Sequence, residues 1–140
     1  MGFHVHTDVY DGADCGSAGG HYNPQGVNHG AWYNSTTKRH VGDWKMLATR
    51  YHGRMSYLHQ DRQASLFEND DYLGFENYVG DRSLVIHAGE DDLGLVDNDG
   101  SRANGNAGAR IACCNIVMAD EYTWRGLKYS AYTTYNHYHW

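Results

Sequence analysis

Histidine is the residue type with the clearest chemical potential in this chain, which holds ten imidazoles among its 140 residues. His4 and His6 are separated by one residue, and the alternation over residues 2–8 predicts a strand that places both rings on one face. Two imidazoles on one face can ligate a single metal ion. Because such pairs also arise from plain surface alternation, this pair alone is a weak indication of metal binding.

Three further imidazoles and one carboxylate have the donor chemistry of a zinc site: His21, His29, His40 and Asp43. A set of four protein ligands leaves no obvious position for a water molecule, so it favours a structural ion. His87 ends a short apolar run over residues 83–88. Taken by itself, a histidine in that position is more commonly a hydrogen-bonded core residue than a metal ligand.

The elements that must position these side chains are predicted to be strands, because Gly, Asn and Asp interrupt the chain too often for long helices. The expected fold class is therefore all-β. Residues 42–49 and 54–61 predict a hairpin that turns at Gly53, and residues 109–118 predict a core strand. The connections over residues 11–41 and 89–109 are too long for ordinary loops, which indicates a functional role.

Composition limits the function classes. The length fits one domain, and the formal net charge of −6 with scattered Lys and Arg argues against nucleic-acid binding. No apolar run approaches the roughly 18 residues that cross a bilayer, so no membrane partner is expected. The first residues lack the basic and apolar regions of a secretory signal peptide.

Three cysteines allow one intrachain disulfide with one thiol left over. Cys113 and Cys114 are adjacent and unsuited to pairing with each other, so Cys15 is expected to pair with one of them. The last segment, residues 119–140, differs from the rest because Tyr and Trp are concentrated there. It is compatible with additional strands or with an exposed aromatic tail.

Seven motifs occur in order along the chain: GFHVH (2–6), CGSAGGHYNP (15–24), HG (29–30), RHVGD (39–43), LVIH (84–87), DDLG (91–94) and GNAGARIAC (105–113). Together they closely resemble the Cu,Zn superoxide dismutase family over about residues 2–118. The resemblance implies an antioxidant oxidoreductase that converts superoxide into oxygen and hydrogen peroxide, with copper and zinc as cofactors.

The resemblance also implies a role for each matching residue. Copper would be bound by His4, His6, His21 and His87. Zinc would be bound by His21, His29, His40 and Asp43, so that His21 bridges the two ions and serves in catalysis. Asp91 would link a copper histidine to a zinc histidine. Arg110 would be the catalytic arginine that holds the superoxide anion, and Cys15 would pair with Cys113.

The family fold is a flattened eight-stranded Greek-key barrel, a form of β-sandwich, and the resemblance begins at its fourth strand. This chain therefore lacks the first three family strands, and we expect a partial domain over residues 1–118 followed by an aromatic extension over residues 119–140. The barrel would be completed by that extension, by a homo-oligomer or another partner chain, or by sequence preceding Met1 in a longer protein.

Several positions depart from the family pattern. Ala103 and Asn104 stand where the family usually carries Lys-Thr, and Arg102 would only partly restore the positive charge that attracts the substrate. Cys114 stands in place of a common glycine and is expected to be a buried small hydrophobe. The histidines without a family role are expected to be solvent-exposed: His52, His59, His137 and His139.

The main competing function is a non-enzymatic, secreted, self-assembling copper- and zinc-binding protein of the same superfamily. The histidine excess, the acidic charge and the Tyr-rich end favour it. A third hypothesis is an isolated fragment that binds zinc without forming a copper site. The aromatic end favours an extracellular location, and the cytoplasm is the alternative, because the family keeps its disulfide even in reducing compartments.

Overall fold

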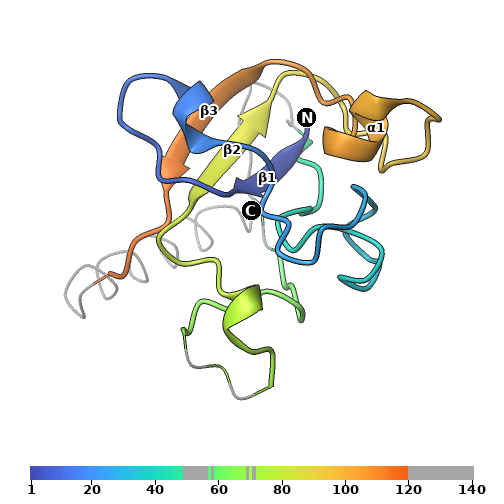
Figure 1. The fold of residues 1–140 in the computed structure, drawn as a ribbon. Helices are drawn as coiled ribbons and strands as arrows, with labels where there is room; N and C mark the ends of the chain where they lie inside the picture. The colour runs from blue at the N-terminus through green and yellow to red at the C-terminus, as the bar shows by residue number, and fades with distance from the viewer. Residues whose placement is uncertain (49–56, 58, 69, 71, 120–140) are drawn as a thin grey trace, which may run out of the picture.

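A three-stranded antiparallel sheet forms the centre of the fold in the computed structural model, which describes residues 1–48, 57, 59–68, 70 and 72–119. The strands are β1 (Phe3–His6), β2 (Ser83–His87) and β3 (Arg110–Asn115), in the order β1-β2-β3 (Figure 1). The helical elements among these residues are short: η1 (Cys15–Ala18), η3 (Phe75–Asn77) and α1 (Asp99–Asn104). The all-β prediction is confirmed.

The register of the sheet places the histidines of the strands on one face. His4 pairs with Val85 and His6 with Ser83 in an antiparallel ladder, and paired residues share a face. His87 lies two residues beyond Val85, so its ring joins that face as well. A register irregularity between Ile86 and His87 interrupts the pairing of β2 with β3 at this end.

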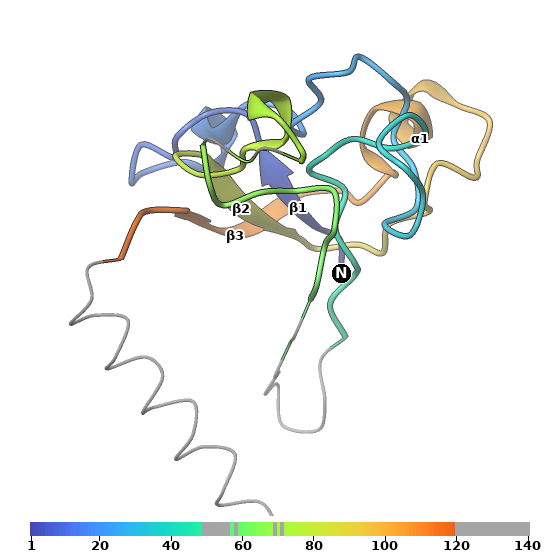
Figure 2. The same ribbon diagram turned by 90° about the horizontal axis from the view of Figure 1, so that it is seen from below.

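The later part of the long loop that follows β1 lies against the strand's other edge. Figures 1 and 2 show this later part, in light blue to teal, on the side of β1 opposite β2, whereas the first part, with η1, lies next to β2 and β3. Val5 anchors it in both directions: its N–H donates to the Gly42 carbonyl, and its carbonyl accepts from the Tyr22 N–H, both at 2.9 Å. A Cβ at Gly42 would collide with the Val5 carbonyl oxygen, so only glycine permits this approach.

The buried apolar residues form a small core between this loop and the sheet. Val5, Tyr22, Val41 and Val79 are its buried members, and Trp44 packs against them. The core therefore ties β1 to the loop that carries the histidines and Asp43. Its position explains why β1 is buried along most of its length.

The predicted hairpin is not formed by the residues that the structure describes. Residues 44–48 have no strand structure, and the only pairing in this stretch is an isolated bridge between Asp43 and His4. Residues 57 and 59–61 are likewise not in a strand, while the rest of the predicted hairpin, with its turn at Gly53, lies outside the described residues. The physical reason is that Asp43 is held against the histidines, so its neighbours follow the loop rather than a sheet.

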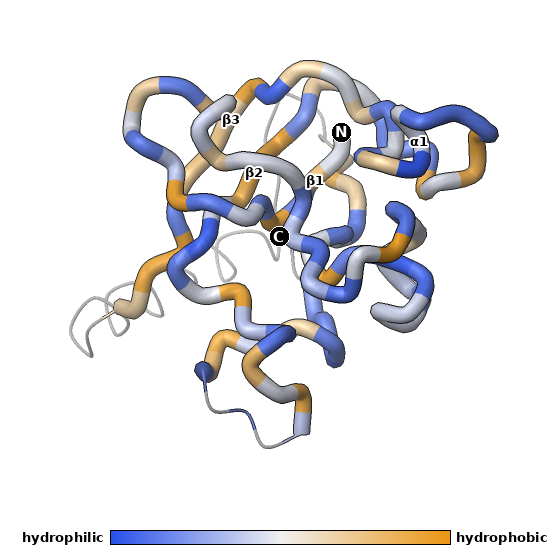
Figure 3. Tube along the Cα trace, viewed as in Figure 1, coloured by the Kyte–Doolittle hydropathy of each residue, from blue (hydrophilic) through white to orange (hydrophobic). Residues whose placement is uncertain are grey.

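β3 forms as predicted but is not a core strand. It pairs with β2 on one side, and Ile111 on it is 56% exposed. The residues that follow are also exposed, with Val117 at 71% and Met118 at 80%. Figure 3 shows that the tube beyond β3 has the orange colour of hydrophobic residues. Cys114 is exposed as well, which corrects the expectation that it is buried.

An apolar groove of about 340 Å³ lies beyond the end of β3. It is lined by Leu66, Phe67, Tyr78, Gly80 and residues 116–119. The aromatic extension predicted over residues 119–140 lies, after Ala119, outside the described residues. Among the helices that the structure describes, none has the length and apolar character needed to span a bilayer.

Candidate metal centre

The first histidine set lies on the buried face of β1 and β2. His4, His6 and His87 come from the two strands, and His21 reaches them from the loop through an isolated bridge with His6. Each offers one ring nitrogen, and these four atoms lie within 4.8 Å of one another. All four residues are buried. The structure thus brings together residues that are separated by more than half of the chain.

In His6 and His87, a hydrogen bond from the ring nitrogen that faces away from the set fixes the orientation of the ring. Nδ1 of His6 lies 2.9 Å from the Gly19 carbonyl, and Nδ1 of His87 lies 3.0 Å from the Gly108 carbonyl. A carbonyl can only accept, so these Nδ1 atoms carry the proton and each Nε2 keeps its lone pair. The two Nε2 atoms face each other at 3.3 Å, as the donors of one ion would.

The second set is arranged around one carboxylate oxygen. Oδ1 of Asp43 lies 3.0 Å from Nδ1 of His21, 2.8 Å from Nδ1 of His29 and 3.1 Å from Nδ1 of His40. Its other oxygen, Oδ2, accepts from the backbone N–H groups of Gly30 and His40. Three nitrogens and one oxygen converge, which is a donor set that suits zinc.

His21 belongs to both sets. Among the six histidines of the two sets, the other five each have one nitrogen held by a backbone carbonyl or by Asp91. In His21, Nδ1 faces Asp43, whereas Nε2 is buried without a hydrogen-bond partner. The ring lies 4.0 Å from that of His4, between centroids. His21 is therefore placed to offer one nitrogen to each set.

Asp91 links the two sets, because it contacts one histidine of each through the ring nitrogen that does not face the set. Its Oδ2 lies 2.8 Å from Nε2 of His4, and its Oδ1 lies 2.7 Å from Nε2 of His29. A Cβ at Gly105 would collide with Oδ1, and the φ of +64° also favours glycine at that position. These contacts leave Nδ1 of both rings facing their respective sets, as an outer carboxylate does in metal sites.

The charge states of the site follow from burial and from the two carboxylates. Burial lowers the pKa of His4 to about 4 and those of His6 and His21 to about 3. Burial would also lower the pKa of His29, but hydrogen bonds to Asp43 and Asp91 outweigh it and raise the pKa to about 9. The carboxyls are themselves desolvated, yet their histidine partners hold both pKa values below the usual range.

These observations fit bound metal ions. Nδ1 of His4 and Nε2 of His21 are buried and lack a hydrogen-bond partner, while Nδ1 of His29 and of His40 face only the carboxylate of Asp43. Orphaned buried nitrogens are costly unless they have a ligand. The lowered pKa values keep His4, His6 and His21 neutral and Asp43 ionised, which are the protonation states that metal coordination needs. His29, whose pKa is raised, would give up its proton to a bound ion.

Acid is expected to destabilise the metal-free protein. The depressed pKa values of His4, His6 and His21 mean that the unfolded chain binds more protons below its ordinary histidine pKa of about 6.5. The free energy of unfolding should therefore fall between about pH 6.5 and 4, with each ring contributing up to about 1.4 kcal/mol per pH unit. The raised pKa of His29 has the opposite effect. Its contribution to the free energy of unfolding is complete below pH 6.5 and is lost as the pH rises toward 9. Equal urea midpoints at pH 7 and pH 5 would contradict this.

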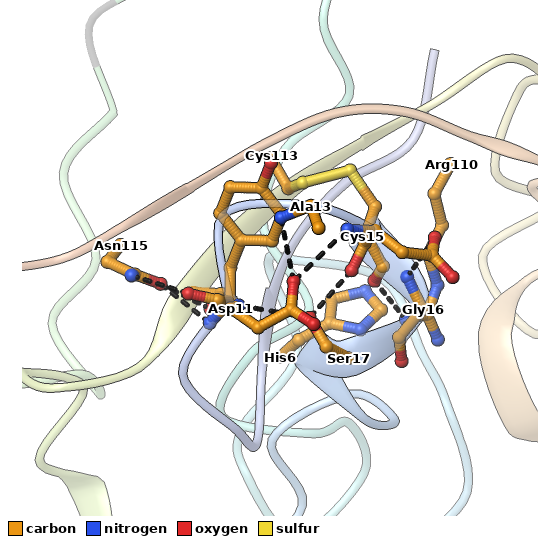
Figure 4. The surroundings of a disulfide bond; sticks show 12 residues. His6, Asp11, Ala13, Cys15, Gly16, Ser17, Arg110, Cys113 and Asn115 are labelled. Carbon is orange, nitrogen blue, oxygen red and sulfur yellow. Dashed lines mark hydrogen bonds between the residues drawn. A yellow bond between two sulfur atoms is a disulfide. The ribbon is translucent and has the colours of Figure 1, made fainter.

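Arg110 and the disulfide lie near His6, a member of the first histidine set (Figure 4). Cys15 and Cys113 are bonded, which confirms the expected pairing and joins η1 to β3. The Arg110 guanidinium donates to the carbonyls of Cys15 at 2.7 Å and Gly19 at 2.5 Å. The Gly19 carbonyl also accepts from His6 Nδ1, so the same loop orients the arginine and a histidine.

Arg39 is a supporting residue that the sequence analysis missed. It is fully buried, and its guanidinium donates to the backbone carbonyls of His40, Val41 and Asp43. Asp61 accepts two further bonds from it at 2.9 Å each. The place of Arg39 immediately before His40 is the sequence feature that could have indicated its role. Nothing in the sequence identifies Asp61 as the partner of Arg39.

Removing the partner of Arg39 should be costly. We expect Asp61→Asn to lower the free energy of unfolding by about 3 kcal/mol, because it leaves a buried guanidinium without a counter-charge. Urea denaturation measures this. Asp97→Asn is the control, since the Asp97–Arg102 pair is exposed to solvent and should contribute little to the free energy of unfolding. Equal effects of the two substitutions would refute the proposed support role.

His59 is not solvent-exposed, contrary to the sequence-based expectation. Its side chain is 8% exposed, and its ring lies 5.4 Å from Trp44 and 5.9 Å from Tyr57, between centroids. Burial lowers its pKa despite the nearby Asp61. The remaining histidines without a family role lie outside the described residues: His52, His137 and His139.

Two sets of possible metal ligands share one buried imidazole on an antiparallel scaffold, an arrangement that could hold two metal ions. The family model for copper/zinc superoxide dismutase matches residues 1–116. The chain therefore belongs to the copper/zinc superoxide dismutase family, whose metals are copper and zinc.

Curated relatives agree with that assignment. The chain is 41% identical over 118 residues to a Cu-Zn superoxide dismutase of Schizosaccharomyces pombe, covering 84% of this chain and 71% of that protein. It is 43% identical over 112 residues to one of Claviceps purpurea, covering 80% and 67%. An extracellular Cu-Zn superoxide dismutase of Caenorhabditis elegans is 40% identical over 120 residues, which cover 86% of this chain but only half of that protein.

Proposed function

We propose that this chain is a superoxide dismutase: two superoxide anions and two protons become one dioxygen and one hydrogen peroxide. The observation that carries the proposal is His21, whose two ring nitrogens face different ligand sets. A shared imidazole is what a paired copper and zinc centre requires. The curated relatives named above are superoxide dismutases, which supports the same activity.

We assign copper to His4, His6, His21 and His87, and zinc to His21, His29, His40 and Asp43. When bound, copper supplies one-electron oxidation and reduction, while zinc has no redox chemistry and holds the loop. Arg110 binds the anion, because its guanidinium is always charged and its hydrogen bonds to the loop fix its direction. Nε2 of His21 would carry a proton only while it is not bound to an ion, and could then donate that proton to the product. Asp91 fixes the orientation of the His4 and His29 rings through its hydrogen bonds.

Reconstitution tests the proposal directly. The protein is loaded with copper and zinc, the metal content is measured, and superoxide decay is followed by pulse radiolysis. We expect turnover that is lost in His87→Ala and reduced by about 10- to 100-fold in Arg110→Met. Tight binding of both metals without turnover, together with large assemblies, would instead support the non-enzymatic metal-binding protein.

The scaffold supports a second, structural proposal. β3 pairs only with β2 among the described residues, and apolar side chains are exposed along it and around the adjoining groove. Exposed strand edges and apolar patches of this kind are usually covered. We propose that another copy or another chain completes the barrel. Sedimentation that shows a monomer at all concentrations tested would exclude this.

The proposed location is extracellular. One relative carries that description, and a disulfide is stable in an oxidising compartment. Fractionation of the native source would decide between this and a cytoplasmic enzyme.

A further inference from the structure

The apolar groove beyond the end of β3 has walls that the backbone holds in place. It is lined by Leu66, Phe67, Tyr78, Gly80, Ile116, Val117, Met118 and Ala119. A parallel bridge joins Ser65 to Tyr78, which fixes the first wall against the second. The Ile116 N–H donates to the Arg82 carbonyl at 2.8 Å, which fixes the third wall. The groove is therefore formed before anything enters it.

The lining of the groove exposes much apolar surface. Phe67 is 72% exposed, and Val117 and Met118 are exposed to a similar degree. Contiguous apolar surface of this kind usually marks a place that another segment or another protein covers. The volume of about 340 Å³ suits one or two large side chains and not a helix or a strand. The expected occupant is therefore a bulky apolar or aromatic side chain.

Carboxylates border the groove. Glu68 is exposed directly after the first wall, and Oδ2 of Asp81 accepts from the Tyr78 hydroxyl at 3.3 Å. Neither carboxylate forms an ion pair with a cation in the part of the chain that the structure describes. The nearby Arg82 guanidinium is engaged elsewhere, with Cζ 3.4 Å from the centroid of the Tyr22 ring. The rim of the groove therefore favours a positively charged occupant.

Residues 122–140 have the composition that this groove calls for. Seven of these nineteen residues are Tyr or Trp, two are the cations Arg125 and Lys128, and none is Asp or Glu. The segment also begins at the right place, because Ala119 itself lines the groove. An extended chain spans at most about 3.6 Å per residue, so Trp124 can lie no more than about 18 Å from Ala119. A tether this short gives an effective concentration in about the millimolar range.

A second copy of the chain is a poorer occupant of the groove. A twofold contact brings the same patch of both copies together. Glu68 and Asp81 would then face their own counterparts, and like charges repel. The cations of residues 122–140 would instead face these carboxylates. The open edge of β3 is left for the partner chain proposed above.

We propose that residues 120–140 fill the groove of their own chain, with the Trp124 indole as the anchor and the Arg125 guanidinium beside Glu68. A Trp side chain buries about 150–250 Å² of surface, more than any other residue of the segment could supply from one position. The segment would thus cover the apolar surface that β3 leaves open. This proposal does not depend on the metals or on turnover.

Disulfide trapping tests where the segment lies. The full chain with Cys114→Ser, which removes the free thiol, carries Glu68→Cys and Arg125→Cys and is exposed to a mild oxidant. The control pairs Arg125→Cys with Glu90→Cys, which replaces an exposed carboxylate outside the groove. Because docking raises the local thiol concentration, we expect a link within one chain that forms about 10-fold faster than in the control. Links between chains, or equal rates for the two pairs, would overturn the proposal.

Dye binding tests whether Trp124 is the anchor. The fluorescence of 8-anilinonaphthalene-1-sulfonate reports exposed apolar surface, and it is measured on the full-length protein over a range of protein concentrations. Trp124→Ala should open the groove and raise the bound dye by about 3-fold. Trp140→Ala, the same change at the other Trp of the segment, should leave dye binding nearly unchanged. Dye binding that is equal in the unmodified protein and Trp124→Ala, or equal in the two variants, would show that Trp124 does not fill the groove.

Discussion

Replacing His21 with alanine is expected to deplete the protein of both metals at once. In the proposed assignment His21 is the one residue that belongs to both ligand sets, with Nδ1 at 3.0 Å from Asp43 Oδ1 and Nε2 facing the strand histidines. Its loss leaves three protein ligands for each ion. Substituting a residue that hydrogen-bonds to a metal ligand weakens metal binding by about 10- to 100-fold. The loss of a direct ligand should weaken the binding of both ions by more than that. Metal content after dialysis against a weak chelator measures the effect.

Two single substitutions serve as matched controls. His40→Ala removes a ligand from the zinc set alone, and His6→Ala removes one from the copper set alone. Each should weaken one metal strongly and the other much less. If His21→Ala retained either metal at the level of the unmodified protein, the shared-ligand assignment would be wrong.

Removing the disulfide should cost both stability and turnover. The Cys15–Cys113 bond closes a loop with a sequence separation of 98 residues, and a cross-link of that span stabilises a fold by about 4–5 kcal/mol in the chain-entropy model. The bond also fixes the loop whose carbonyls orient Arg110. We therefore expect Cys15→Ser with Cys113→Ser to lower both the free energy of unfolding and kcat/KM.

Urea denaturation of the metal-free proteins separates the stability effect from metal binding. Cys114→Ser is the control, because this exposed thiol has no disulfide and its replacement should change the free energy of unfolding by no more than about 0.5 kcal/mol. Full kcat/KM in the double serine variant under stabilising conditions would show that the disulfide does not position Arg110.

The parts of the site that the sequence predicted are those with a local pattern. The alternation around His4 and His6 predicted β1 over residues 2–8, and the strand spans Phe3–His6. The apolar run ending in His87 predicted β2 within one residue. What linked these distant segments was the ordered resemblance to a family, because spacing cannot show which strands become neighbours.

The failures have a common physical cause, which is tertiary context. A strand was predicted over residues 42–49, but Asp43 is held by three histidines, and residues 42–48, the part that the structure describes, do not form it. Apolar composition predicted a buried β3, yet burial depends on a covering layer, and Ile111 remains exposed. The reverse holds for His59, a polar residue enclosed by aromatic rings from other segments.

The pairing register of β3 has a consequence for oxidative folding. Cys113 lies opposite Val85 and Cys114 opposite Leu84, so the pleat sends the two neighbouring thiols to opposite faces. A slip of one residue would present Cys114 to Cys15 and expose Cys113. A wrong cross-link would then trap the misaligned sheet covalently. A bond from Cys15 to Cys113 therefore indicates the correct register of β3, and a bond to Cys114 indicates a shifted one. Peptide mapping of the refolded protein can measure the fraction of molecules with each bond.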